Sequence, residues 1–163
     1  MKKRVTLGLL LAFALFSISA TYKSPETETT GGSINFFKGS YKEALVEAKK
    51  ENKLVFIDAY AAWCGPCKML KQHTFTDKAV AQYFNEHFIN VAVDVEQGEG
   101  PDVATKYNVT HFPTLIIADK DGKRITFTVG YIQPDDLLGF GRYGMEKAPP
   151  ADKLPKVSAS IPE

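Results

Sequence analysis

The feature that most constrains the fold is an almost uninterrupted apolar run at residues 54–60, Leu-Val-Phe-Ile-Asp-Ala-Tyr. A strand with one face in water alternates apolar and polar residues, whereas a strand covered on both faces is apolar nearly throughout. Helices on both sides of a sheet provide such cover, so the chain is predicted to be an α/β protein. Its 163 residues are enough for one domain with its own hydrophobic core.

The remaining patterns alternate between helical and extended repeats. Residues 40–43 match the capping pattern S-x-x-E of a helix start, and residues 125–129 alternate as in a half-exposed strand. Helices are predicted at 40–51, from Pro66, from Thr76, at 101–107 and from Pro134, and strands at 34–38, 54–60, 89–95, 114–118 and 125–129. This order predicts a central mixed β-sheet flanked by helices on both faces. Gly139 and Gly141 are expected to weaken the last helix.

Residues 1–20 have the organisation of a secretory signal peptide: a basic start, an apolar stretch of about a dozen residues and a small-residue end. The stretch is shorter than the roughly 20 apolar residues of a membrane-spanning helix. A buried N-terminal helix is the alternative reading, and cleavage fits after Ser19 or after Ala20. Export is therefore predicted, and a bacterial periplasm is the compartment that fits best.

Two further segments lack a periodic apolar pattern. Residues 21–33 are polar and are predicted to be a flexible spacer. Residues 147–163 contain four of the nine prolines and few bulky apolar residues, which predicts a disordered tail. The folded domain is therefore expected to span residues 34–146, a usual size for a small α/β domain.

The charge balance argues against two classes of partner. The chain has 20 Lys and Arg residues against 19 Asp and Glu residues, and removal of residues 1–20 leaves 17 bases and 19 acids. A near-neutral domain is not expected to bind nucleic acid or an anionic membrane through its charge. Nothing in the sequence suggests an obligate oligomer, so a monomer is expected.

The two cysteines, Cys64 and Cys67, follow the apolar run and precede a predicted helix. At a helix start, free backbone N–H groups stabilise a thiolate, so Cys64 is a candidate nucleophile and Cys67 a candidate resolving thiol. One alternative is a structural disulfide, which adds little across so short a loop. Another is half of a zinc site, which needs two more ligands, and only three scattered histidines are available. No metal and no cofactor are expected.

The segment Trp63-Cys64-Gly65-Pro66-Cys67-Lys68 resembles the thioredoxin active-site sequence and follows residues 56–60 at that family's spacing. The resemblance covers about residues 34–143 and implies a thioredoxin fold. It implies that Cys64 and Cys67 form the redox-active disulfide and that Asp58, six residues before Cys64, moves the proton of the resolving thiol. Asp58 lies within an apolar strand, which favours a raised pKa. The alternative is a carboxylate without a kinetic role.

The resemblance also implies a substrate-binding groove. Its members here would be Trp63, Gly65, Pro66, Phe112, Pro113 and Gly130. The family places a cis-proline at the position of Pro113. It also places a glycine beside the groove at the position of Gly130, although an ordinary turn glycine explains Gly130 equally well. His111 either approaches Cys64 or is an exposed loop residue.

The chain departs from the family at three positions. Phe112 replaces an aliphatic residue, Tyr60 replaces a tryptophan, and Ala92 stands where a lysine is usual. The last change is expected to leave Asp58 without its usual charged neighbour.

The resemblance and the leader together imply an exported thiol:disulfide oxidoreductase. The Cys-Gly-Pro-Cys sequence matches reducing thioredoxins, with potentials near −270 mV, rather than oxidising relatives near −120 mV. The expected partners are exported proteins with disulfides and a membrane electron donor. The alternatives are a periplasmic oxidase or isomerase, a non-catalytic client-binding module, and a metal carrier.

Overall fold

A computed structural model describes residues 32–149 of the chain. The signal peptide predicted at 1–20, nearly all of the spacer at 21–33 and nearly all of the tail at 147–163 lie outside these residues. The helices are α1 (Tyr41–Glu51), α2 (Gly65–Met69), the π-helix η1 (Leu70–Thr74), α3 (Lys78–His87), α4 (Gly100–Tyr107) and α5 (Pro134–Lys147). The strands are β1 (Leu54–Tyr60), β2 (Phe88–Asp94), β3 (Thr114–Ala118) and β4 (Arg124–Val129).

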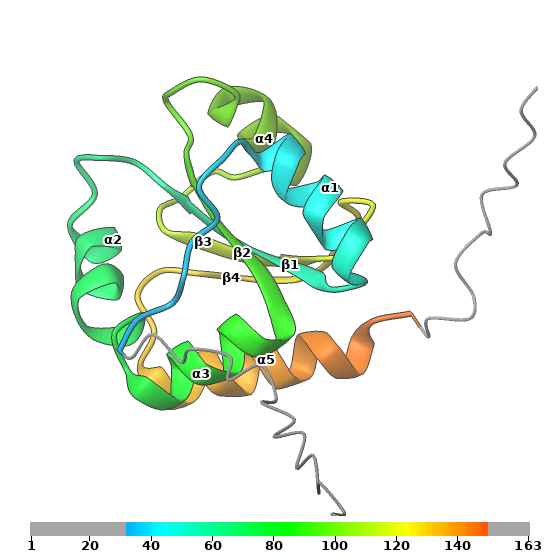
Figure 1. Ribbon diagram of the computed structural model, residues 1–163. Coiled ribbons are helices and arrows are strands. Elements are labelled where there is room, and N and C mark those ends of the chain that lie inside the picture. The colour runs from blue at the N-terminus through cyan, green and yellow to red at the C-terminus, as the bar shows by residue number, and fades with distance from the viewer. Residues whose placement is uncertain (1–31, 150–163) are drawn as a thin grey trace, which may run out of the picture.

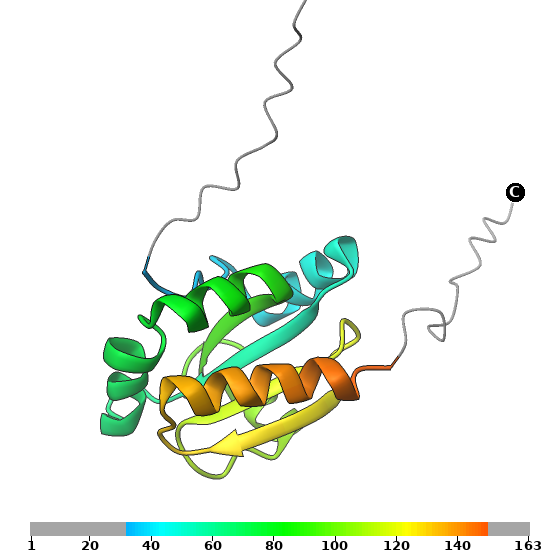
Figure 2. The same ribbon diagram turned by 90° about the horizontal axis from the view of Figure 1, so that it is seen from below.

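The four strands form one mixed sheet in the order β2-β1-β3-β4. β1 is parallel to β2 and antiparallel to β3, and β4 is antiparallel to β3. Helices α1 and α4 cover one face of the sheet, and α3 and α5 cover the other (Figures 1 and 2). The predicted thioredoxin fold is confirmed, including the burial of β1 on both faces, since its five central residues are all buried.

Two apolar cores lie on opposite sides of the sheet. One core joins α1 and α4 to the sheet through residues such as Ala44, Val103 and Ile57. The other joins α3 and α5 to it through Phe84, Leu137 and Phe56. A separate small cluster at the carboxyl end of β1 consists of Ala61, Cys64 and Cys67, with Tyr60 and Phe112 packed against them. The cysteines therefore lie outside both main cores.

The helix starts follow from local hydrogen bonds. Ser40 caps α1: its hydroxyl accepts from the Glu43 backbone N–H at 3.2 Å, and the Glu43 carboxylate accepts from the Ser40 N–H at 2.7 Å. This confirms the predicted capping box. Asp77 caps α3 by accepting from the N–H groups of Ala79 and Val80. Each cap satisfies backbone donors that a helix start leaves without partners.

The strand predicted at residues 34–38 is wrong. The segment forms only an isolated bridge, Phe36 to Asn90, beside the edge strand β2. Two residues before Phe36, Ile34 donates its N–H to the Phe75 carbonyl at 2.8 Å and not to β2. A segment that divides its backbone hydrogen bonds between two partners does not build a continuous ladder.

The helix that follows the cysteines departs from regular geometry. After Met69 the chain forms the π-helix η1, in which the Phe75 N–H donates to the Leu70 carbonyl at 2.8 Å. The wider turn changes the direction in which side chains on this segment project, and such π-helical turns often occur at functional sites. Within residues 32–149, no helix combines the length and apolar character needed to cross a membrane.

Helix α5 contains three glycines whose surroundings differ. A Cβ atom on Gly144 would lie 3.0 Å from Ile117 Cγ2 of β3 and closer still to Ile117 Cδ1. A Cβ atom on Gly141 would lie 2.9 Å from Phe84 of α3. Gly139, by contrast, faces open space. Gly141 and Gly144 therefore let α5 pack closely against its neighbours. Among the three glycines, only Gly139 weakens the helix without allowing a closer contact.

The two end members of this glycine series make a matched stability test. Gly139→Ala is expected to raise the free energy of unfolding by about 0.5–1 kcal/mol, because alanine is the better helix former. Gly144→Ala is expected to lower it by about 1–3 kcal/mol, because the new methyl group overlaps Ile117. Urea denaturation of both variants measures the two effects. A Gly144→Ala variant as stable as Gly139→Ala would contradict the close approach of α5 to β3.

Candidate active site

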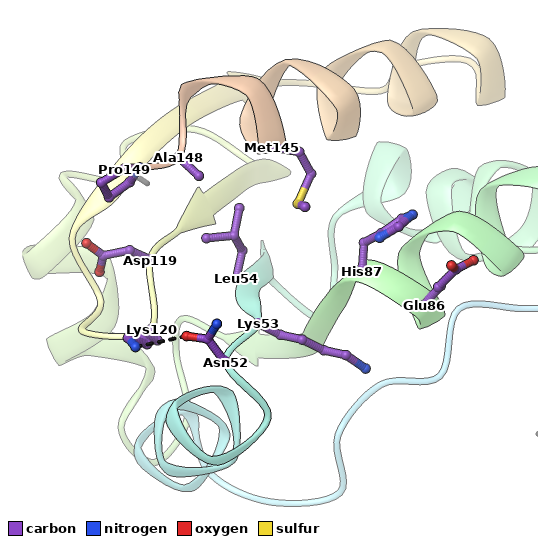
Figure 3. A pocket seen from close by; sticks show the side chains of 10 residues that line it. All are labelled: Asn52, Lys53, Leu54, Glu86, His87, Asp119, Lys120, Met145, Ala148 and Pro149. Carbon is purple, nitrogen blue, oxygen red and sulfur yellow. Dashed lines mark hydrogen bonds between the residues drawn. The ribbon is translucent and has the colours of Figure 1, made fainter. Parts of the chain in front are cut away.

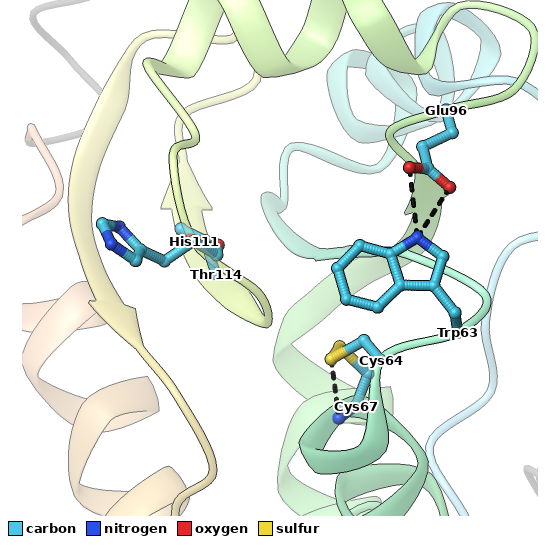
Figure 4. Close-up of a disulfide and its surroundings, with 6 residues drawn as sticks. All are labelled: Trp63, Cys64, Cys67, Glu96, His111 and Thr114. Atoms are coloured by element: carbon cyan, nitrogen blue, oxygen red, sulfur yellow. Dashed lines mark hydrogen bonds between the residues drawn. A yellow bond between two sulfur atoms is a disulfide. The ribbon is translucent and has the colours of Figure 1, made fainter.

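Cys64 and Cys67 form a disulfide at the point where β1 gives way to α2 (Figure 4). The chain turns after β1 through a hydrogen bond from the Cys64 N–H to the Ala61 carbonyl, 3.0 Å long. Cys64 is the N-cap of α2, and its Sγ accepts from the Cys67 N–H at 3.2 Å. Both cysteines are buried. A thiolate on Cys64 would keep this N–H as a hydrogen-bond donor, which would stabilise its charge.

Trp63 lies beside the disulfide with two thirds of its surface exposed. Its indole N–H is directed at the Glu96 carboxylate, at 3.1 Å from each oxygen (Figure 4). Its ring meets the Phe112 ring edge to face, with centroids 6.0 Å apart. Glu96 belongs to no sequence motif that marks it as a site residue. Trp63 follows β1 and Glu96 follows β2, and because these strands are parallel their carboxyl ends meet at one edge of the sheet.

The loop before β3 brings the other predicted groove residues together. The Phe112–Pro113 peptide bond is cis, as the family resemblance implied. The Gly130 N–H donates to the Pro113 carbonyl at 2.8 Å, and Gly130 has a φ of 92°, a conformation that favours glycine. Gly130 therefore lies against the proline loop.

Gly65 and Pro66 are exposed at the start of α2, next to the disulfide. The predicted groove residues thus come from the turn after β1, the loop before β3 and the turn after β4. Their contact with a substrate remains a prediction.

His111 does not approach Cys64. Its side chain is exposed, and Nδ1 lies 2.9 Å from the Thr110 hydroxyl. The imidazole points to the side of the loop remote from the disulfide (Figure 4). Of the two sequence-based readings, the exposed loop histidine is the one that the structure supports.

Asp58 is completely buried in β1. Among the described residues, neither of its carboxylate oxygens has a hydrogen-bond partner. Burial raises the pKa of the Asp58 carboxyl from its ordinary value of 3.8 to about 7, and the charge of Lys71 acts in the opposite direction. A carboxyl group with a pKa near neutral can both accept and release a proton under ordinary conditions.

Asp58 lacks the charged neighbour that is usual in the family, but Lys71 supplies a positive charge from another element. Ala92 does lie opposite Asp58 on β2, where it offers only a methyl group. Lys71, on η1, supplies a positive charge that acts on Asp58 instead. Its Nζ lies 3.4 Å from the centroid of the Tyr60 ring. The sequence signal was its spacing of four residues from Cys67, which is about one helical turn.

One cavity lies away from the disulfide, at the other end of the sheet. It has a volume of about 330 Å³ and opens where β1 and β2 begin (Figure 3). Its lining residues are Asn52, Lys53, Leu54, Glu86, His87, Asp119, Lys120, Met145, Ala148 and Pro149. Since Cys64 and Cys67 follow the opposite end of β1, this cavity does not belong to the candidate site. In residues 32–149, no three His, Cys, Asp or Glu side chains are grouped so that they could hold a metal ion.

Comparison with protein families gives a match over residues 41–144 to the thioredoxin-like domain model. Thioredoxin-2 of Saccharomyces cerevisiae is 43% identical over 90 residues, which are 55% of this chain and 77% of that protein. The thiol:disulfide interchange protein DsbD of Actinobacillus pleuropneumoniae is 25% identical over 150 residues, which are 85% of this chain and 26% of that protein. Three further matching thioredoxins, from Arabidopsis thaliana, Saccharomyces cerevisiae and Pyricularia oryzae, are covered over 48–58% of their lengths, so the chain spans about half of each.

Among solved structures, a solution structure from Bacteroides thetaiotaomicron is similar to this chain. That protein is provisionally described as a disulphide isomerase. It is 39% identical and superimposes with a TM-score of 0.64, over 73% of this chain and 98% of the other.

The buried carboxyl group makes the stability of the disulfide form depend on pH. The folded protein keeps a proton on Asp58 up to about pH 7, whereas the unfolded chain releases it near pH 4. Because of Asp58, the free energy of unfolding is therefore expected to fall by about 4 kcal/mol as the pH rises from 4 to 7, and then to level off. Asp58→Asn should remove this fall.

Urea denaturation at a series of pH values measures the effect. Asp136→Asn serves as the control, because it removes an exposed carboxylate from α5 and should preserve the wild-type profile. If Asp58→Asn and the wild type keep parallel profiles between pH 4 and 8, the carboxyl group does not titrate near neutral pH.

Proposed function

This chain belongs to the thioredoxin-like domain family, and we propose that it is a thiol:disulfide oxidoreductase acting on disulfides in other proteins. The observation that carries the proposal is the Cys64–Cys67 disulfide at the start of α2, beside the Trp63 ring (Figure 4) and with Phe112 of the proline loop packed against the cysteines. Placed there, the two sulfurs form a pair that exchanges electrons, and the surrounding residues form a surface for a protein substrate.

The reaction begins from the reduced pair. The Cys64 thiolate attacks one sulfur of a substrate disulfide, and that disulfide breaks as a Cys64–substrate mixed disulfide forms. The departing substrate thiolate takes up a proton. Cys67 then loses its proton and attacks Cys64 Sγ, which releases the second substrate thiolate and closes the Cys64–Cys67 disulfide. Two electrons pass from the protein to the substrate. Asp58 is the proposed acceptor of the Cys67 proton.

The proposed direction of electron flow is reduction of the substrate. A family member is a strong oxidant when its reduced form is stabilised. An imidazolium beside the nucleophile would give such stabilisation, but the His111 ring is turned away from Cys64 (Figure 4). The Cys-Gly-Pro-Cys sequence supports the same direction. An isomerase or oxidase role is the second candidate, supported by the name of the Bacteroides thetaiotaomicron neighbour.

Export is the proposed location of this activity. It is supported by the leader-like residues 1–20 and by the similarity to the thiol:disulfide interchange protein DsbD over 85% of this chain. In an exported setting the oxidised Cys64–Cys67 pair needs an electron source, and we propose a membrane protein as that donor. The proposed substrates are exported proteins with disulfides, bound by a monomer.

Substitution of the cysteines separates the two steps. Cys64→Ser and Cys67→Ser should both lose nearly all activity in an insulin-reduction assay, because one lacks the nucleophile and the other the resolving thiol. Only Cys67→Ser should accumulate mixed disulfides that dithiothreitol releases. His73→Ser, on the exposed side of η1, is the control and should act as the wild type. Retained activity in Cys64→Ser would remove this cysteine as the nucleophile, and a Cys67→Ser variant without mixed disulfides would favour a binding module.

The reduction potential decides between reductant and oxidant. We expect a value near −270 mV, as for reducing thioredoxins, since no imidazolium stabilises the reduced Cys64. Equilibration in glutathione buffers of defined ratio, followed by alkylation and mass spectrometry, gives the potential. A value above about −150 mV would contradict the reductant proposal.

A further inference from the structure

The surroundings of Asp58 explain why one nearby charge matters. Its neighbours across the sheet are Ala92 on β2 and Leu115 on β3, which offer no polar group. Asp58 shares its face of β1 with Phe56, and the helices over that face present Val80, Phe84 and Leu137 to the sheet. A carboxylate in such surroundings lacks both water and hydrogen-bond donors, so its ionised form depends on any charge that reaches it.

Lys71 is held where its charge can act on this face. Its Nζ lies 3.4 Å from the Tyr60 ring centroid, within the range of a cation–π contact. Tyr60 is two residues after Asp58 in β1, and alternate residues of a strand point to the same face. The ammonium group therefore lies over the next side chain along the face that contains Asp58.

The contact with Tyr60 is made from the π-helix η1. Lys71 is the second residue of η1, where the carbonyl of Leu70 accepts from an N–H five residues later. A cation on a flexible stem normally points into water. Here Nζ contacts the Tyr60 ring at the carboxyl end of β1, although the Lys71 residue as a whole is exposed.

Other charged and titratable groups near Asp58 do not provide a positive charge. Tyr60 is on the same strand, and Asp94 ends β2 and is near enough to act on Tyr60. The N-cap of α2 and the helix itself carry Cys64 and Cys67, which are joined in the disulfide. Lys68, also on α2, is exposed and does not act on the Asp58 carboxyl. Asp94 and an ionised tyrosine would both oppose ionisation of Asp58 rather than favour it. Lys71 is the one cation in residues 32–149 found to act on Asp58.

We propose that Lys71 is a positioning residue that stabilises the ionised Asp58 carboxylate and so governs how readily Asp58 takes the proton of Cys67. In this role it acts through Asp58. This role rests on the proposed disulfide exchange for its consequence, whereas the interaction between Lys71 and Asp58 stands apart from any activity.

The first test measures Asp58 itself in the disulfide form. The carboxyl carbon of Asp58 is followed by ¹³C NMR against pH in the wild type, Lys71→Met and Lys71→Arg. Methionine keeps an unbranched side chain over Tyr60 without the charge, and arginine keeps the charge. The midpoint of the Asp58 titration should rise by about one pH unit in Lys71→Met and stay near the wild-type value in Lys71→Arg. Lys78→Met removes an exposed lysine at the start of α3 and should leave the midpoint unchanged.

The second test follows the rate of disulfide reduction against pH. If the rate follows the ionised fraction of Asp58, Lys71→Met should be slower by roughly fivefold at pH 7 and should approach the wild type at pH 9. In an Asp58→Asn background, Lys71→Met should cause no further change in the profile. This double-variant comparison isolates an effect that passes through Asp58.

The outcomes separate the two proposals. An Asp58 midpoint that is the same in the wild type and Lys71→Met overturns the role of Lys71, whatever the enzyme activity. A slower Lys71→Met with an unchanged Asp58 midpoint also overturns it, as does a full Lys71→Met effect in the Asp58→Asn background. A wild-type protein that reduces no disulfide overturns the proposed function instead, while the NMR titration still reports the charge interaction.

Discussion

The burial of β1 on both faces is the constraint on which the rest of the structure depends. Two helices on each side of the sheet cover this strand, and its five central residues are buried. The same cover that drives folding through apolar burial also removes water from Asp58. The carboxyl group therefore has a pKa near 7 because of its position in the fold, and not because of a hydrogen-bond network built around it.

The candidate site forms where several elements end together. The turn after β1 carries the cysteines and Trp63, the segment after β2 carries Glu96, and the loop before β3 carries Phe112 and the cis-proline. Strand ends suit this purpose because the strands fix the distances between the loops, whereas the loops are free to vary in sequence. The contacts between the Trp63 and Phe112 rings and between Gly130 and Pro113 tie these loops to one another.

Local patterns carried most of the fold prediction. The apolar run of β1 and the capping box of α1 depend on residues close in sequence, so they were readable directly. The wrong strand at 34–38 has a strand-like composition, but its hydrogen bonds go to two distant partners, which no local pattern records. The roles of Lys71 and Glu96 could not be predicted from the sequence for a related reason. The role of Glu96 depends on the pairing of β1 with β2, and the contact of Lys71 with Tyr60 joins two elements that no local sequence pattern brings together.

The ring that Cys64 and Cys67 close is small, and its size decides how far the fold depends on the disulfide. The disulfide joins residues three apart, and neither of the two main cores contains a cysteine. So short a crosslink restricts the unfolded chain little. We therefore expect the sheet and its helices to stay assembled in both the oxidised and the reduced state, so that the proposed exchange of two electrons does not unfold the domain.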